Sequence, residues 1–321
     1  LKPGTLKRLI DFFDANPDCS DLLQGPMLAE NFKSLHTHLE PVWTKGMYGF
    51  WGSDDRAKDP AGPPFEIPMQ GLGLFACRKD AWVGFNPRFR GFGGEEGYLH
   101  EKFRQRSGKA LCIPFLRWLH RFARPGGVPY PINWHDRIFN YMVGIEELGL
   151  DPKPMRDHFK EHLGEESGLE ILKRVDKEIR SPFFYFDAIY CICPDTNGSK
   201  WRRMNRRFQA LEIEVSVRIF KIVAPLDNAH LNYTMSHRAI VQEAMQLGLE
   251  NVLIFEDDTL FLDETLKYLS KSIEELKQRE WNLFYLGGQL LEEPYPCADQ
   301  CSHLSVPQQV RSTHAVAYAC L

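Results

Sequence analysis

The sequence predicts an α/β protein with doubly wound sheets of mixed or parallel strands, divided into two units. The chain has 321 residues, of which 43% are hydrophobic and 12% aromatic, so it carries enough apolar material for substantial cores. Its second half alternates strand-like and helix-like segments, and this order favours a parallel sheet with helices on both faces. A polar stretch that ends near Ser181 separates the halves. We therefore expect units at residues 1–160 and 183–321, with a connecting helix within residues 161–182.

The first half predicts helices mixed with short strands. Thr5 is expected to cap a first helix whose apolar face carries Leu6, Leu9, Ile10 and Phe13. The segments expected downstream are a strand over residues 71–79, a glycine-rich turn over 91–94, a helix over 95–108, and a short strand and loop over 111–122.

The second half predicts a regular alternation of strands and helices. The expected strands cover residues 186–193, 215–223, 251–258 and 282–287, and the expected helices cover residues 199–212, 236–248 and 263–278. In a doubly wound sheet, ligands bind in the crevice at the carboxyl ends of the strands. We therefore look for functional residues where these strands end.

The apolar run at residues 251–255 ends abruptly in Glu256, Asp257 and Asp258. Three neighbouring carboxylates repel one another unless they are solvated or share a cation, and hard divalent cations prefer oxygen ligands. In an enzyme that uses nucleotide sugars, such a cation bridges the diphosphate and neutralises charge on the leaving group. The acidic strand end thus predicts a metal site. The alternative is a solvated turn that caps the next helix.

Further motifs surround this strand end. Ser236-His237-Arg238 stands at an expected helix start before it, and Thr313-His314-Ala315 precedes the strand-like VAYA after it. Residues 186–193 are followed by Trp201-Arg202-Arg203-Met204. Together, residues 184–319 resemble glycosyltransferase family 25, the family of lipooligosaccharide and collagen-modifying sugar transferases.

This resemblance implies a GT-A-like fold, a nucleotide-sugar donor and a divalent metal ion, Mn or Mg. It implies that Glu256, Asp257 and Asp258 hold the metal and that the donor is bound by Ser236, His237, Arg238 and Arg202. A cationic side chain at a helix start complements a diphosphate, which is the role implied for His237 and Arg238. The alternative is that these two residues hold the helix cap and its loop.

In the first half, Gly91, Gly93 and Gly94 precede Glu95 and Glu96 at an expected helix start. Glycine permits left-handed backbone and close approach of a ligand, and the helix dipole favours carboxylates in the first turn. One carboxylate could accept a proton from an acceptor hydroxyl while the other holds a second hydroxyl. The alternative is a capped surface helix with a glycine-rich entry.

The segment from Phe75 through Trp82 to the GFGGEE turn resembles the acceptor-binding half of family 2 and galactosyltransferase-like GT-A enzymes, and the resemblance covers residues 1–159. It implies that Glu96 is the catalytic base and that Glu95 binds the acceptor beside it. It also implies acceptor contacts from Trp82, Gly93 and Gly94. His120 in WLHRF would be a further metal ligand, and its alternative role is that of a hydrogen-bonded structural residue. An upstream acidic metal motif is missing, so we expect both units to be incomplete.

Composition limits the classes of binding partner and the cellular setting that we expect. The 39 Lys and Arg residues and 43 Asp and Glu residues give a formal charge of −4, which provides no attraction to nucleic acid. No apolar run is long enough to be a transmembrane segment in the visible chain. Eight scattered cysteines suit reduced thiols and hence a cytoplasmic setting, with a peripheral position at the inner membrane face as a further option.

Two weaker patterns have competing interpretations. Trp43, Tyr48 and Trp51 are either a sugar-stacking platform or core aromatic residues. Cys297, Cys301 and His303 are either part of a zinc site or, as the missing second cysteine pair favours, a structural loop.

The sequence therefore predicts a metal-dependent glycosyltransferase, built from parts of two successive GT-A-type units. It would transfer a sugar from a nucleotide sugar to a hydroxyl of a glycan, lipid-linked or protein acceptor, in surface glycan or lipopolysaccharide synthesis. The main alternative is a non-catalytic carbohydrate-binding or scaffold protein derived from the same fold. A nucleotidyltransferase is less favoured, because the chain start has no glycine-rich, lysine-containing phosphate loop.

Overall fold

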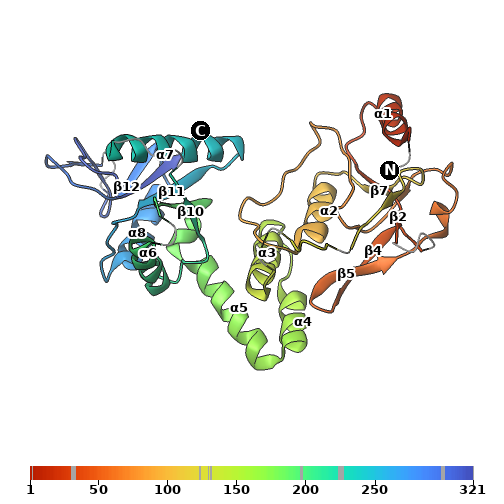
Figure 1. The fold of residues 1–321 in the computed structure, drawn as a ribbon, viewed down its shortest axis with the longest axis horizontal. Coiled ribbons are helices and arrows are strands. Elements are labelled where there is room, and N and C mark those ends of the chain that lie inside the picture. The colour runs from red at the N-terminus through yellow and green to blue at the C-terminus, as the bar shows by residue number, and fades with distance from the viewer. Residues whose placement is uncertain are drawn as a thin grey trace. The chain divides into compact units, whose positions relative to one another are not determined.

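The computed structural model describes residues 1, 3–29, 34–122, 124–128, 130, 132–195, 198–222, 228–297 and 301–320 (Figure 1). The chain divides into two compact units, Leu1–Val175 and Asp176–Leu321. The division falls inside helix α5 (Glu165–Arg180). This helix lies within residues 161–182, the segment expected to connect the units. The mixed α/β class predicted from the sequence is confirmed.

The second unit is built on one five-stranded sheet. Its strand order is β10-β9-β11-β15-β12, in which β9, β10 and β11 are parallel and β15 runs antiparallel to both of its neighbours. The elements of this unit are η2 (Pro182–Tyr185), β9 (Ala188–Ile192), α6 (Ser199–Ala210), β10 (Val217–Phe220), α7 (Ala229–Gln246), β11 (Asn251–Glu256), α8 (Thr265–Leu276), β12 (Leu283–Gly287), β13 (Tyr295–Pro296), β14 (Ser305–Val306) and β15 (Ala315–Ala319). The predicted βαβαβ order is confirmed.

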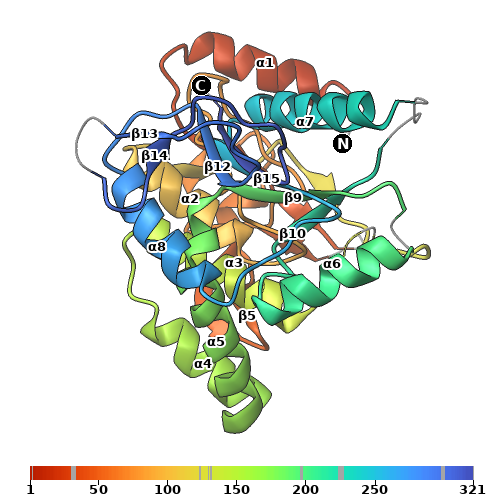
Figure 2. The same ribbon diagram turned by 90° about the vertical axis from the view of Figure 1, so that its left-hand side faces the viewer.

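Helices cover both faces of this sheet because residues on its strands point alternately to opposite sides. Ile189, Cys191 and Phe255 pack with Met204 and Phe208 of α6 and with α8. On the opposite face, the intervening strand residues pack against Ile240 and Ala244 of α7. Figure 1 shows α7 on one side of the sheet and α6 and α8 on the other, and Figure 2 shows the small β13–β14 hairpin beside α8.

Helix α7 begins earlier than the sequence predicted. The expected start at Ser236 is wrong, because Asn228 caps the helix by accepting a hydrogen bond from the Leu231 N–H. Ser236, His237 and Arg238 therefore lie in the middle of α7, and the Ser236 hydroxyl donates to the Asn232 carbonyl one turn back. The predicted helix-start role of this motif does not hold.

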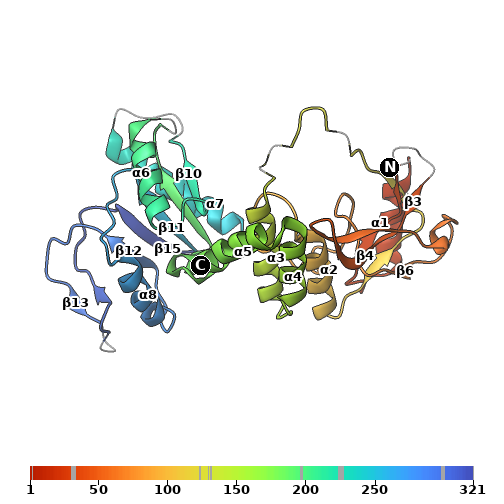
Figure 3. The ribbon, with the colours of Figure 1, turned by 90° about the horizontal axis from the view of Figure 1, so that it is seen from below.

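The first unit has small sheets in place of one large one. In its described part the strands form β1-β7-β6, β3-β2-β8 and the β4–β5 hairpin. The elements are α1 (Thr5–Ala15), β1 (Leu22–Gln24), β2 (Met27–Leu28), β3 (Leu35–His36), β4 (His38–Thr44), β5 (Met47–Gly52), η1 (Asp55–Ala57), β6 (Phe65–Glu66), α2 (Glu95–Gln105), β7 (Ala110–Cys112), β8 (Trp118–Leu119), α3 (Trp134–Glu147) and α4 (Lys153–Leu163). Helices α2 and α3 lie side by side (Figure 3).

Three predictions for the first unit are wrong in detail. Residues 71–79 form no regular strand, and Ala76 makes only an isolated bridge to Leu23. Gly4, in a left-handed conformation, precedes α1 in place of a Thr5 cap. Leu6 and Ile10 of that helix are exposed, because the packed face is set by Leu9, Phe12 and Phe13.

Within the described residues, every helix is too short or too polar to cross a lipid bilayer.

Candidate active site

A cavity of about 800 Å³ opens in the second unit at the topological switch point of the sheet, where the strand order reverses. The chain proceeds from β9 to β10 on one side and then returns to place β11 on the other side of β9. The crevice beyond the carboxyl ends of such strands is the usual ligand site of a doubly wound sheet. Here it is lined by Lys200 of α6, by residues of α7, by the acidic end of β11 and by the segment that leads into β15. This confirms the expectation that the strand ends face a cavity.

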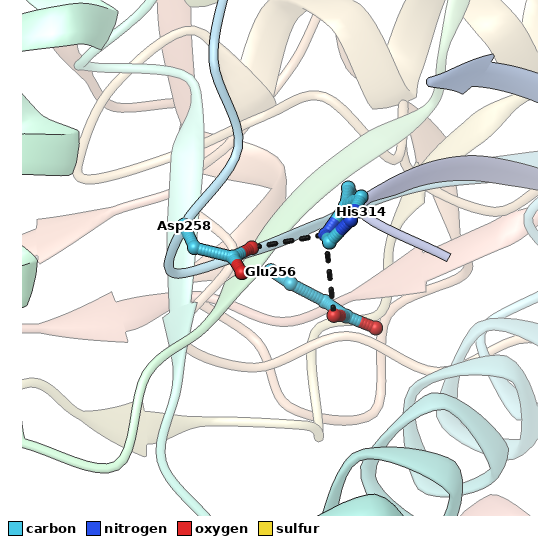
Figure 4. A group of neighbouring side chains, drawn as sticks. All are labelled: Glu256, Asp258 and His314. Carbon is cyan, nitrogen blue, oxygen red and sulfur yellow. Dashed lines mark hydrogen bonds and ion pairs between the residues drawn. The ribbon is translucent and has the colours of Figure 1, made fainter. Parts of the chain in front are cut away.

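Three potential metal ligands converge in this cavity. Oxygen atoms of Glu256 and Asp258 and a ring nitrogen of His314 all lie within 4.8 Å of one another (Figure 4). His314 Nδ1 is 3.0 Å from Asp258 Oδ1 and 3.9 Å from Glu256 Oε2. The backbone fixes this approach, since the Glu256 N–H donates to the His314 carbonyl at 2.9 Å. Two carboxylates and one imidazole form a donor set suited to a divalent cation such as Mn²⁺.

Glu256 is held in place by neighbouring side chains. The Thr313 hydroxyl donates to Glu256 Oε1 at 2.6 Å, and His237 Nε2 lies 3.5 Å from the same oxygen. Burial alone would raise the pKa of Glu256, but the contacts with His237 and Thr313 and the charge of His314 bring it below its ordinary value. Glu256 is thus kept ionised, which is the form that binds a cation.

His237 is itself oriented by Tyr318 of β15, whose hydroxyl lies 3.0 Å from His237 Nδ1. The imidazole is 7% exposed, and its Nε2 has no hydrogen-bond partner among the described residues. The 3.5 Å separation from Glu256 supports an electrostatic contact and is too long for a directed hydrogen bond. His237 therefore lies near Glu256 Oε1, whereas the distance to His314 is measured from Oε2.

Asp257 points to different partners. Its side chain is almost fully buried, Oδ1 accepts from the Tyr233 hydroxyl at 3.0 Å, and both carboxylate oxygens lie 3.1 Å from Lys200 Nζ. Burial and the neighbouring Asp257 charge raise the pKa of Tyr233, so its hydroxyl stays protonated and donating. Asp257 lies outside the converging group of Glu256, Asp258 and His314.

The predicted site residues of the second unit divide into two groups. His237, Arg238, Glu256, Asp257 and Asp258 all line the cavity. Ser236 is buried within α7 and Arg202 is exposed on α6, and neither lines it. The cavity residues to which the sequence analysis gave no role include Lys200, Tyr233, Arg311, Thr313, His314 and Tyr318.

The first unit holds Glu95 and Glu96 in the first turn of α2, as the sequence predicted. Gly93 and Gly94 precede them with φ angles of 101° and 100°, in the left-handed region that favours glycine. Asn140 of α3 secures the turn, because its side-chain amide donates to the Gly93 carbonyl at 2.9 Å.

Burial raises the pKa of both carboxyl groups of this turn, and the negative charge of Glu95 raises that of Glu96 further. A nearby Arg137 opposes the shift without cancelling it. A carboxyl group with an elevated pKa is suited to accept a proton near neutral pH.

The remaining predicted residues of the first unit lie among aromatic rings. Trp82 is 36% exposed and stacks on Phe75 with ring centroids 5.6 Å apart. His120 packs between Trp118 and Phe122, at 5.7 Å and 4.0 Å. Within the described part of the chain, the structure brings no group of three metal ligands together around His120.

The Cys297, Cys301 and His303 pattern also lacks a converging ligand set among the described residues. His303 Nδ1 pairs with Glu275 of α8 at 3.0 Å, and Glu275 further accepts from the Ser302 and His303 backbone N–H groups. These contacts attach the loop to α8, which agrees with its interpretation as a structural loop.

The elevated pKa values predict a pH-dependent effect on stability. A carboxyl group that binds its proton more tightly in the folded than in the unfolded chain lowers stability as the pH rises above the ordinary value of 4.5. We therefore expect Glu96→Gln to raise the melting temperature at pH 8 relative to wild type, and to leave it nearly unchanged at pH 4. Differential scanning calorimetry at both pH values measures this. Glu146→Gln, at an exposed site on α3, is the control, and an equal gain at both pH values would contradict the elevated pKa.

Part of the chain matches a known protein family. Residues 155–303 match the model of glycosyltransferase family 25 (LPS biosynthesis protein). This family 25 segment covers somewhat less than half of the chain and includes β9, β10, β11, α6, α7 and α8, together with Glu256 and Asp258. The predicted resemblance of residues 184–319 is thereby confirmed over residues 184–303. His314 lies beyond the family 25 segment, and the resemblance of residues 1–159 to family 2 remains a prediction. No curated protein matches the chain.

Proposed function

We propose that this protein is a metal-dependent glycosyltransferase that acts in the synthesis of lipopolysaccharide-type surface glycans. The observation that carries the proposal is the convergence of Glu256, Asp258 and His314 in a cavity at the strand ends of the family 25 segment. The donor would be a nucleotide sugar, and the acceptor a hydroxyl group of a glycan, lipid-linked or protein molecule.

The charge of the cavity supports a requirement for metal. Its three carboxylates, Glu256, Asp257 and Asp258, are matched by three basic side chains, Lys200, Arg238 and Arg311. When its histidines are neutral these charges balance, so the cavity alone offers no excess positive charge to a diphosphate, which is costly to remove from water without compensation. A divalent cation held by Glu256, Asp258 and His314 would supply that charge and stabilise the departing diphosphate.

Several side chains of the cavity would bind the donor. Arg238 and Arg311 can donate hydrogen bonds to phosphate oxygens, and neither guanidinium has a side-chain partner among the described residues. Lys200 would stay paired with Asp257. In the transfer, an acceptor oxygen bonds to the anomeric carbon of the sugar while the bond from that carbon to the diphosphate oxygen breaks. The acceptor proton passes to a base, and the nucleoside diphosphate leaves.

For the first unit, we propose that Glu96 is a base for an acceptor hydroxyl and that Glu95 binds the acceptor. The elevated pKa of Glu96 and its place after two left-handed glycines support this role. Trp82 is exposed enough to contact a sugar ring, and Gly93 and Gly94 allow the acceptor to approach the backbone. The role of His120 as a metal ligand remains a prediction.

Screening nucleotide sugars for release of nucleoside diphosphate tests the proposed function. We expect release with at least one sugar donor in the presence of Mn²⁺ and its loss when the metal is chelated. Saturable glycan binding without any nucleotide release would favour the non-catalytic carbohydrate-binding alternative.

The contact between His237 and Glu256 leads to a further prediction. His237→Gln removes the imidazole that supports the carboxylate, and loss of such an outer partner lowers metal affinity by about 10–100-fold. Calorimetric titration with Mn²⁺ in the absence of nucleotide measures this directly. Tyr318→Phe should show a smaller effect in the same direction, since it only frees the ring of His237. Unchanged Mn²⁺ affinity in folded His237→Gln protein would show that Glu256 needs no support.

A further inference from the structure

The first unit contains a second cavity, separate from the one that Glu256 and Asp258 line. It has a volume of about 740 Å³ and lies between the β4–β5 hairpin, helices α2 and α3, and the start of α4. This size falls within the roughly 300–1,000 Å³ of small-ligand pockets. Gly94 and Gly97 line it and belong to the helix turn that carries Glu95 and Glu96. Glu95 and Glu96 lie between these two glycines in the chain, but neither side chain lines the cavity.

The walls of the cavity are apolar and aromatic. Its aliphatic and thioether lining includes Ile67, Met69 and Met155, which are almost fully buried. Its aromatic part contains Trp43, whose ring centroid is 4.8 Å from that of Tyr48 and 4.7 Å from that of Tyr141. Trp43 and Tyr48 of the predicted stacking platform thus line one cavity, whereas Trp51 packs against His36 elsewhere.

Gly97 lets the aromatic wall approach α2. A Cβ atom at this position would lie only 2.9 Å from Tyr48 Cδ1, so a larger side chain would displace the tyrosine ring. The helix therefore presents bare backbone to the ring.

The charged groups around this cavity are mainly acidic. The charged residues that line it are the acidic Glu66, Glu101 and Asp151 and the basic Arg104. The Arg104 guanidinium already donates to Glu101 at 2.9 Å and to the Pro68 carbonyl at 2.6 Å. A phosphate or nucleotide would meet net negative charge here, which disfavours binding. In this respect the cavity differs from that of the second unit, where basic and acidic side chains balance. The ligand it suits is uncharged.

Polar groups along the same walls can serve a ligand that carries hydroxyls. The Trp43 indole N–H and the Tyr48 hydroxyl have no hydrogen-bond acceptor among the residues that the structure describes. The carboxylates of Glu66 and Asp151 can accept from hydroxyl groups. Apolar walls with a few polar groups are the usual composition of a small-molecule site.

We propose that this cavity binds an uncharged aryl glycoside, with the aryl ring against the aromatic wall and the sugar hydroxyls at the acidic edge. The assignment of this ligand as a sugar acceptor rests on the proposed function, because it uses Glu95 and Glu96. Binding of the aryl glycoside itself does not depend on metal or nucleotide.

The test uses the full chain without metal or nucleotide, and two probes that differ only in the aglycone. Calorimetry should show that 4-nitrophenyl β-glucoside binds at least tenfold more tightly than methyl β-glucoside. Saturation-transfer NMR should show the strongest signal on the aryl protons. Equal affinity for the two probes, or saturation confined to the sugar protons, would overturn the proposal.

Paired tryptophan substitutions locate the binding. Leu150 lines the cavity and is 45% exposed, so Leu150→Trp should fill its edge without disturbing the core and should abolish aryl glycoside binding. Leu119→Trp is the matched control, since Leu119 is 44% exposed in the same unit and does not line the cavity. Melting temperatures verify folding of both variants. Equal binding by the two variants would overturn the assignment. If Leu150→Trp does not fold, Trp43→Phe replaces it, and loss of one hydrogen bond should weaken binding about two- to tenfold.

Measurements of Mn²⁺ and nucleotide binding on the same proteins keep the two proposals separate. Metal-dependent donor binding without aryl glycoside binding would reject only the cavity assignment. Aryl glycoside binding by a protein that binds neither Mn²⁺ nor nucleotide would support the cavity and reject the proposed function.

Discussion

Replacement of Asp258 by Asn is expected to abolish measurable Mn²⁺ binding and metal-dependent nucleotide release. The substitution removes one of three converging ligands, so the loss of affinity should exceed the about 10–100-fold cost of losing an outer partner. Without the cation, the diphosphate loses its main compensating charge, and turnover should fall by at least about 10²–10³-fold. Mn²⁺ calorimetry and a nucleotide-release assay measure the two effects, and His314→Ala should reproduce both.

Two neighbouring aspartates provide controls for this experiment. Asp263→Asn changes an exposed carboxylate in the following loop and should leave metal binding intact. Asp257→Asn weakens the contact with Lys200, so it should impair donor binding more than Mn²⁺ binding. If Asp257→Asn removes Mn²⁺ affinity and Asp258→Asn does not, the metal site is centred on the other carboxylate.

The second large effect is expected at Glu96 in the first unit. Glu96→Gln keeps the shape of the side chain and removes its ability to take a proton, and a positioned base contributes about 10²–10⁴-fold to a rate. In a sugar-transfer assay of a chain whose first unit is intact, turnover should fall by this amount, whereas donor affinity should change little. Because burial raises the pKa of Glu96, the wild-type rate should rise with pH well above the ordinary range of a carboxyl group.

The control at Glu146, an exposed glutamate on α3, separates catalysis from general charge effects. Glu146→Gln should keep both the rate and its pH profile. A Glu96→Gln enzyme with normal turnover would leave only the helix-capping role for this residue.

Much of the second unit follows from local sequence patterns. Continuous apolar runs identify β9 and β11, and the run before Glu256 locates the acidic strand end at the cavity. The sequence places the start of α7 too late, because Asn228 lies about two helical turns before the Ser236 motif and the residues between them form no marked apolar face. A single side-chain hydrogen bond decides that boundary.

The composition of the site was harder to predict, because it depends on contacts distant in sequence. His314 reaches Asp258 from 56 residues away, through an antiparallel strand whose position in the sheet no local pattern specifies. Likewise, the three adjacent carboxylates look equivalent in sequence. In the structure they differ, because Asp257 contacts Lys200 and Tyr233, whereas Glu256 and Asp258 lie near His314. In the first unit, residues 71–79 have the composition of a strand but make only one isolated bridge, at Ala76.

The position of β15 has a consequence for how the second unit assembles. This strand is later in the chain than both of its neighbours, β11 and β12, yet it lies between them. In the described sheet β12 pairs with β15 alone, so neither can dock until residues 315–319 have been synthesised. Since domains fold as the chain emerges, Asp258 would meet the imidazole of His314 only after 56 further residues have been synthesised. A cation bound by His314 and Glu256 would then link β15 to β11. Amide hydrogen exchange in β15 should therefore slow when Mn²⁺ is added.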